Sequence, residues 1–173
     1  GADAPDIIQK LTLGGSELAV GFIQRAEMGA QSISQSIKIA RLTHDEFAVI
    51  TATGQAASMV ELLEGVPADC AHTLDLSSSL AGVAITGPCS IEILSAITEL
   101  DVSSKAMPNL TCAQSRFADI YGLLLRYDIA GLPSYQIYVT REFGEYFWKA
   151  VIEAAHVIGA GPVGVEGVSA LTS

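Results

Sequence analysis

The segment 134–158 constrains the fold more than any other part of the chain, because its apolar pattern changes from strand spacing to helix spacing at one point. Within 134–140 every second residue is a large apolar or aromatic one, as in a strand that buries one face. From residue 141 to 158 the spacing is helical, and Gly159 stands where a C-cap glycine is expected. The residues expected to be buried are Tyr135, Ile137 and Val139 on the strand and Phe143, Phe147, Ala150, Val151 and Ala154 on the helix.

Similar patterns earlier in the chain predict an antiparallel α+β fold. The predicted elements run strand, strand, helix, then strand, strand, helix again, and then several strands before the long helix. This order is typical of antiparallel sheets with helices, and not of alternating parallel units. The repeated ββα order also indicates an internal duplication. Strands are predicted over 34–42 and 47–51, which the turn 43–46 joins into a hairpin, and over 72–76 and 80–86, which pair around Ser77-Ser78-Ser79. Two more are predicted over 112–118 and 120–128, with Asp119 near their turn. Helices are predicted over 54–64, with Thr53 as N-cap and Gly65 and Pro67 ending it, and over 90–100.

The start of the chain is predicted from its turn residues. Residues 1–15 contain Pro5, Gly14 and Gly15 and show weak periodicity, so we expect an extended arm or a leading strand there. A chain of 173 residues is long enough for one domain with a core of its own, and no linker that could separate two domains is evident. We therefore expect a single domain over residues 1–173.

The composition indicates that part of the surface is covered by a partner. Half of the residues are hydrophobic and 16% are charged, whereas ordinary domains carry about 25% charged residues. A large exposed apolar patch usually marks a binding site on a soluble protein. A well-packed domain rich in alanine and glycine is the alternative explanation, and the sequence leaves both open.

Charge and cysteine content exclude several classes of protein. Nine Lys and Arg against 19 Asp and Glu give a formal charge of −10, which is unsuited to binding nucleic acid or anionic lipid. No apolar run approaches the roughly 20 residues of a membrane span, and no signal-peptide pattern is present. Cys70, Cys89 and Cys112 are far apart and odd in number, which predicts free thiols in the cytoplasm and no metal site.

The chain offers few candidates for chemistry, and each has a simpler explanation. The segment 159–164 is spaced like a dinucleotide-binding loop but follows a predicted helix instead of a strand, so we interpret it as a helix end. Cys112 could form a thiolate pair with His72 or His156, although a core cysteine is favoured. We therefore predict no catalytic, cofactor-binding or metal-binding residue. Solvated surface positions or turns account for Ser77, Ser78 and Ser79 and for the pairs Asp45/Glu46, Glu61/Glu64 and Glu142/Glu145.

An aromatic cluster in the last helix suggests a contact surface. Phe143 and Phe147 belong to the predicted core stripe, and Trp148 lies about 100° further around the helix. Trp148 either covers the edge of the core or anchors a partner, because tryptophan and tyrosine are enriched at binding hot spots. The sequence does not decide between these two roles.

From about residue 72 to 171 the chain resembles the folate-binding aminomethyltransferase superfamily, which includes the glycine-cleavage T-protein and subunits of heterotetrameric sarcosine oxidase. In order and spacing the matching segments resemble the short gamma subunit of that oxidase. The resemblance implies a T-protein-like fold. The segments that carry it are 75–77, 85–88 with the helix that follows, 112–116, 126–131, 135–139, and Phe147-Trp148 with 161–164.

The chain departs from this superfamily where folate-using members bind the pterin ring. Those members read GELGYE at the entrance to the strand at Tyr135, with a glutamate that bonds the pterin. Here the segment 131–136 reads GLPSYQ, so Leu132 stands in place of that glutamate and Gln136 replaces the second acid. A leucine side chain accepts no hydrogen bond, and each unpaired buried polar group costs roughly 1–3 kcal/mol. The resemblance therefore implies the fold without its pterin-binding chemistry.

The function implied is that of a non-catalytic structural subunit of a sarcosine oxidase-like, flavin-dependent amine oxidoreductase. Its partners would be the larger subunits, which would hold FAD, FMN, NAD and tetrahydrofolate, and this chain would bind none of them. The alternative is a stand-alone folate-binding or aminomethyltransferase-like protein of one-carbon metabolism. In that case Asp75, Arg126 and Tyr135 are the first candidates for the pocket. A third hypothesis is one domain of a longer oxidoreductase.

Overall fold

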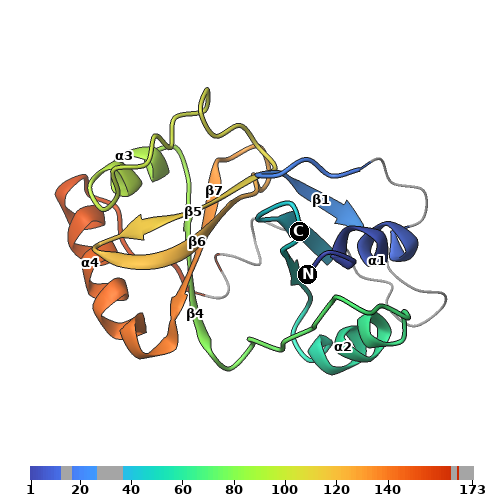
Figure 1. Ribbon diagram of the computed structural model, residues 1–173. Helices are drawn as coiled ribbons and strands as arrows, with labels where there is room; N and C mark the ends of the chain where they lie inside the picture. Colours follow the sequence, from blue (N-terminus) through green and yellow to red (C-terminus); the bar gives the residue numbers. More distant parts are fainter. Residues whose placement is uncertain (13–16, 27–36, 165–166, 168–173) are drawn as a thin grey trace. The chain divides into compact units, whose positions relative to one another are not determined.

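The computed structural model describes residues 1–12, 17–26, 37–164 and 167, and its chain forms two compact units, Gly1–Ser78 and Ser79–Ser173 (Figure 1). Both units combine antiparallel sheets with helices, so the predicted α+β class is confirmed. The single domain stays a prediction. Gly14, Gly15 and the first three residues of the strand predicted over 34–42 lie outside the described residues.

The first unit contains a three-stranded antiparallel sheet in the order β1-β2-β3. The hairpin predicted around residues 43–46 is confirmed, because β2 pairs with β3 and Arg41 lies opposite Phe47. Ile37 and Ile39 of β2 are fully buried, as their alternation indicates. The first strand was not predicted, since it is short and only partly apolar. The strands are β1 (Ile23–Ala26), β2 (Ile37–Arg41) and β3 (Phe47–Ile50).

Two helices pack against this sheet, and the first corrects the expected extended arm. Residues Ala4–Leu11 form α1. Pro5 is compatible with this helix because it lies in the first turn, where its missing N–H costs nothing. Ile8 of α1 and Met59 of α2 (Ala56–Glu64) bury their side chains in the same core as Ile37 and Ile39. The helix α2 ends at Gly65 as predicted, but its N-cap is Gln55, so the prediction of Thr53 as N-cap is wrong.

The second unit contains a four-stranded antiparallel sheet in the order β4-β7-β6-β5. The partner of β4 is β7, which pairs with it along its whole length from Leu80 opposite Thr140 to Thr86 opposite Ser134. Residues 72–76 form no strand, so the predicted pairing with them is wrong and the second ββα unit lacks its first strand. The strands are β4 (Leu80–Thr86), β5 (Thr111–Phe117), β6 (Ile120–Arg126) and β7 (Ser134–Thr140).

Helices α3 (Ser90–Ser95) and α4 (Gly144–Val157) cover one face of this sheet (Figure 1). The predicted alternation on β7 is confirmed, because its three apolar side chains are fully buried together with Phe147 of α4. Phe143 was expected in the core but lies in the short 3-10 helix η1 (Arg141–Phe143) and is exposed. Among the described residues, no helix is both long and apolar enough to cross a membrane.

Two tight turns with positive φ angles shape the ends of this sheet. Ala118 and Asp119 join β5 to β6 with φ angles of 48° and 66°. Ala130 and Gly131 form a second turn between Ile129 and Leu132, with φ angles of 51° and 77°. Positive φ at both central residues is typical of the type I′ hairpin turn. The second turn fixes the position of Leu132 beside the start of β7.

Candidate functional site

Two residues named by the folate-binding hypothesis meet where β6 ends and β7 begins. Arg126 and Tyr135 lie opposite each other in the register of these strands. The guanidinium carbon of Arg126 lies 5.4 Å from the centre of the Tyr135 ring, within the range of a cation–π contact. This end of the sheet is therefore the candidate pterin site.

The Arg126 side chain is buried and bonded inside the protein. Its Nε donates to Oδ1 of Asp128 at 3.1 Å, and its Nη2 donates to Oδ2 at 3.3 Å. Its Nη1 donates to the backbone carbonyl of Met107. A bidentate pair of this kind has a fixed geometry and uses both carboxylate oxygens. Arg126 and Asp128 thus hold the loop before β5 against the sheet.

The Tyr135 side chain is fully buried and, like Arg126, bonds to a backbone carbonyl in a loop outside the sheet. Its hydroxyl donates to the backbone carbonyl of Val102 at 3.0 Å. Burial raises the pKa of Tyr135, the charge of Asp128 raises it further, and the charge of Arg126 lowers it. The phenol therefore stays protonated at neutral pH and acts as a hydrogen-bond donor within the core.

The two positions that replace the pterin-binding acids present no carboxylate. Leu132 is half-buried, its N–H donates to the carbonyl of Ile129 at 2.9 Å, and its carbonyl accepts from the Ile129 N–H at 3.0 Å. Gln136 accepts a hydrogen bond from the Tyr138 hydroxyl at 3.3 Å. Asp128, the carboxylate at this end of the sheet, is already paired with Arg126. Leu132 and Gln136 thus supply no carboxylate where the resemblance implies one for a pterin ring.

Asp75, the third residue of the folate-binding hypothesis, belongs to the first unit. Its carboxylate is exposed and accepts a hydrogen bond from the Ser77 N–H at 2.8 Å. Hydrogen bonds from the hydroxyl and the backbone N–H of Ser77 lower the pKa of Asp75. Asp75 therefore stabilises a local turn.

The remaining candidates are Cys112 and the two histidines named as its possible partners, together with the segment after α4. Cys112 is buried, and this burial raises the pKa of its thiol to about 11, which disfavours a thiolate. His156 is exposed on α4, and His72 belongs to the first unit. The segment after α4 ends the helix as interpreted, since Gly159 has a φ of 73°. No group of three potential metal ligands occurs among the described residues.

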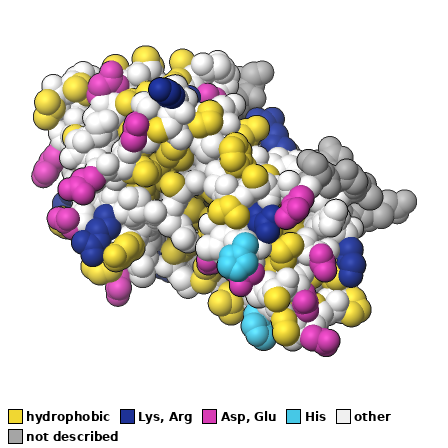
Figure 2. Space-filling model, turned by 45° about the horizontal axis from the view of Figure 1, so that its top comes forward, with side chains coloured by type: hydrophobic (Ala, Val, Ile, Leu, Met, Phe, Trp, Pro, Cys, Tyr) yellow, Lys and Arg dark blue, Asp and Glu magenta, His cyan; other side chains and the backbone are white. Residues whose placement is uncertain are grey.

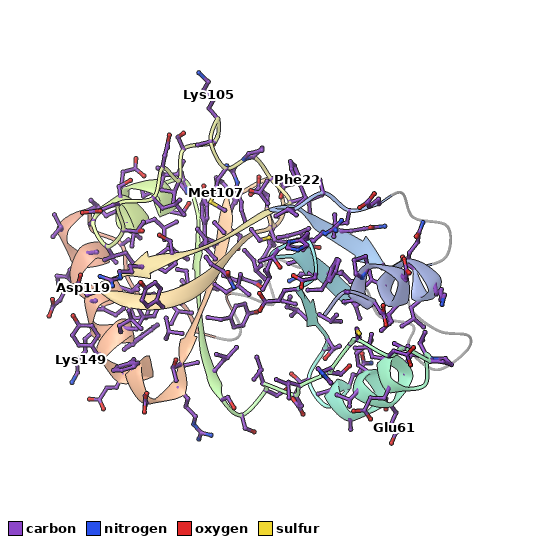
Figure 3. All side chains as sticks on the ribbon, in the orientation of Figure 1. Phe22, Glu61, Lys105, Met107, Asp119 and Lys149 are labelled. Carbon is purple, nitrogen blue, oxygen red and sulfur yellow. The ribbon has the colours of Figure 1, made fainter. Side chains whose placement is uncertain are left out.

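A groove on the surface of the second unit is the other candidate site. It has a volume of about 940 Å³ and lies between the loop after α3, the tip of the β5–β6 hairpin and the exposed side of α4. Asp119, at the hairpin tip, lies beside α4 (Figure 3). Tyr121 is 70% exposed and Val157 is 86% exposed, and both line the groove. The groove therefore offers apolar surface to solvent.

The comparison with protein families decides where the chain belongs. The model of the GCVT N-terminal domain matches residues 1–172. The chain belongs to this family. The resemblance to the aminomethyltransferase superfamily is thereby confirmed.

Individual relatives connect this GCVT N-terminal domain with sarcosine oxidase. The alpha subunit of sarcosine oxidase from Rhizobium meliloti (strain 1021) is 32% identical over 76% of the chain and 14% of its own length. An aminomethyltransferase from Bacteroides thetaiotaomicron is 32% identical over 51% of the chain and 24% of its own length. A solved chain of heterotetrameric sarcosine oxidase from Corynebacterium sp. U-96 shares the fold, with a TM-score of 0.74 and 21% identity over 95% of this chain and 78% of that chain.

The chain thus spans less than a quarter of the length of these two sequence relatives. It is a domain related to sarcosine oxidase and aminomethyltransferase. The match to alpha subunits does not test the expected gamma-subunit role. The groove was missed by the sequence analysis, although Arg116 and Tyr121 flank a recognisable two-residue turn and face each other across it.

Proposed function

We propose that this GCVT N-terminal domain is a non-catalytic structural subunit in a multi-subunit, flavin-dependent amine oxidoreductase of the sarcosine oxidase type, with the role of a gamma subunit. The observation that carries the proposal is the amount of large apolar surface that the second unit leaves exposed. Exposed apolar groups of this size favour burial against a partner. They are Tyr121, Phe143, Tyr146, Trp148, Val157, Ile158 and Val163, and a partner that docks on one side of the unit would cover only part of this set.

The same proposal assigns the cofactors to other subunits. Leu132 and Gln136 offer no carboxylate to a pterin, and Arg126 and Tyr135 are bonded within the core. FAD, FMN, NAD and tetrahydrofolate would then be held by the larger subunits. The complex would work in the cytoplasm, where the thiols of Cys70, Cys89 and Cys112, which form no disulfide in the described structure, would stay reduced.

Co-expression with the larger subunits of the proposed complex tests the structural role. We expect one complex in size-exclusion chromatography with light scattering, and a loss of solubility or of flavin content in the large subunit when this chain is omitted. A large subunit that folds, binds its flavins and stays active without this chain, and never associates with it, would contradict the proposal.

The alternative, a folate-binding protein, is supported by the similarity to an aminomethyltransferase. It is tested by titrating the isolated chain with tetrahydrofolate and following the fluorescence of Trp148, the single tryptophan. We expect no saturable change. Submicromolar binding by the chain alone would favour the alternative over the structural role.

A further inference from the structure

We propose that the groove between α4 and the β5–β6 hairpin binds a segment of a larger partner subunit that presents an apolar side chain flanked by lysine or arginine. This inference rests on the proposed function and names the surface and the chemistry of the contact. Three properties of the groove support it: fixed walls, an exposed apolar lining and a surplus of carboxylates.

Two hydrogen bonds to backbone carbonyls hold the loop after α3 against the hairpin. The Thr98 hydroxyl donates to the carbonyl of Arg116 at 2.7 Å, and the Ala118 N–H donates to the carbonyl of Ile97 at 2.7 Å. These two bonds join the loop after α3 to the tip of the hairpin. A site formed before binding requires less ordering when the partner arrives.

The lining combines small floor residues with large exposed ones. Ala118 of the hairpin and Ala150 and Ala154 of α4 leave room for an inserted side chain. Tyr121 of the hairpin and Val157 of α4 both line the groove and are both largely exposed. Tyr146 lies one helical turn before Ala150 and extends the same exposed stripe of α4. An apolar side chain bound in the groove would cover part of this surface, which water now contacts.

Tyr121 is held in one orientation by Arg116. The guanidinium carbon of Arg116 lies 4.7 Å from the centre of the Tyr121 ring, and Nη2 donates to the Tyr121 hydroxyl at 3.2 Å. Tyrosine and arginine are enriched at binding hot spots, and a side chain that is already ordered loses little entropy on binding. We therefore place the main contact of the groove at this pair.

The charges around the groove favour a basic partner. Glu99, Asp119 and Glu153 line it together with one cationic side chain, Arg116, which gives a formal charge of −2. Complementary charges steer association and suppress the wrong partners. A second copy of this chain would bring a surface of the same sign, since the whole chain carries a formal charge of −10. On the face that Figure 2 shows, acidic side chains are scattered among the hydrophobic ones.

The test measures binding of the full chain to the purified larger subunit of the same complex, at low and at moderate salt. Tyr121→Ala and the double reversal Glu99→Lys with Glu153→Lys change the groove. Trp148→Ala is the matched control, because two residues along a helix place Trp148 about 160° away from Ala150. Circular dichroism of each variant confirms that it is folded. We expect both groove changes to raise Kd by about tenfold or more, and the control to change it by less than about twofold.

The outcomes separate this inference from the proposed function. A wild-type chain that binds, with Kd changed by Trp148→Ala but not by the groove variants, overturns the groove and leaves the structural role intact. A wild-type chain that does not bind the larger subunit overturns both. A dimer of the isolated chain that Tyr121→Ala dissociates would show that a second copy occupies the groove, and would also overturn the inference. Binding by wild type that weakens with salt, and a reversal variant that loses this dependence, support it.

Discussion

The substitution Tyr135→Phe tests how the core of the second unit is held together. It removes one oxygen from a fully buried side chain and leaves the ring in place, so the packing and the contact with Arg126 persist. The lost bond joins the hydroxyl to the carbonyl of Val102, a residue that is itself buried. A buried carbonyl that loses its partner costs about 1–3 kcal/mol of the free energy of unfolding.

Urea unfolding at neutral pH measures this loss as a lower midpoint with an unchanged slope. Thermal unfolding then adds information on the two units. A loss of about 2 kcal/mol lowers the melting temperature by about 10 °C if Ser79–Ser173 unfolds by itself, and by about 5–6 °C if the whole chain unfolds as one unit. The expected single domain corresponds to the smaller shift.

The control is the same chemical change at an exposed position. Tyr121→Phe removes a hydroxyl that accepts one bond from Arg116 at the surface, and we expect a change below about 0.5 kcal/mol. Equal effects of the two substitutions would refute the reasoning, because the Tyr135 hydroxyl would then contribute no more than a surface group.

Two further predictions concern the turn before β7 and the buried thiol. Ala130→Asn should stabilise the protein by about 0.5–1 kcal/mol in urea unfolding, because asparagine tolerates the positive φ of this exposed turn position better than alanine; a lower midpoint would contradict this. The free energy of unfolding should fall as pH rises from 9.0 towards about 11, because the Cys112 thiol ionises first in the unfolded chain. Cys112→Ala should flatten this part of the pH profile measured with reducing agent, whereas the same change at the exposed Cys89 should not; equal profiles would contradict the assignment.

The elements that sequence reasoning predicted well are those specified by neighbouring residues. β7 was predicted to the residue and α4 to within three residues at its start and one at its end, because their periodicities are regular and change at one point. The β2–β3 and β5–β6 hairpins were predicted because their strands follow each other directly. A local pattern of this kind predicts a strand and also the neighbouring strand that pairs with it.

The errors concern features that local patterns do not contain. The pairing of β4 with β7 joins segments separated by a helix and two strands, so the adjacent residues 72–76 were wrongly chosen as its partner. The helix α1 was missed because Pro5 reads as a turn residue, although it is equally suited to a first helical turn. In both cases the deciding contacts are tertiary.

The candidate sites differ in the same way: some of their features follow from neighbouring residues, and others depend on contacts between distant segments. The replacement of an acid by Leu132 can be read from a continuous motif, and the structure adds only that a tight turn presents it. Arg126 could bind a ligand only if its guanidinium were not already bonded within the protein. Its bonds to Asp128 and Met107 and the register of β6 with β7 decide this, and the sequence pattern does not predict them. The groove depends still more on distant contacts, since three separate segments each contribute residues that carry no signal alone. A departure from a motif can therefore argue against an inherited site from the sequence alone, whereas a docking surface on the same domain becomes visible only when the segments that build it are brought together.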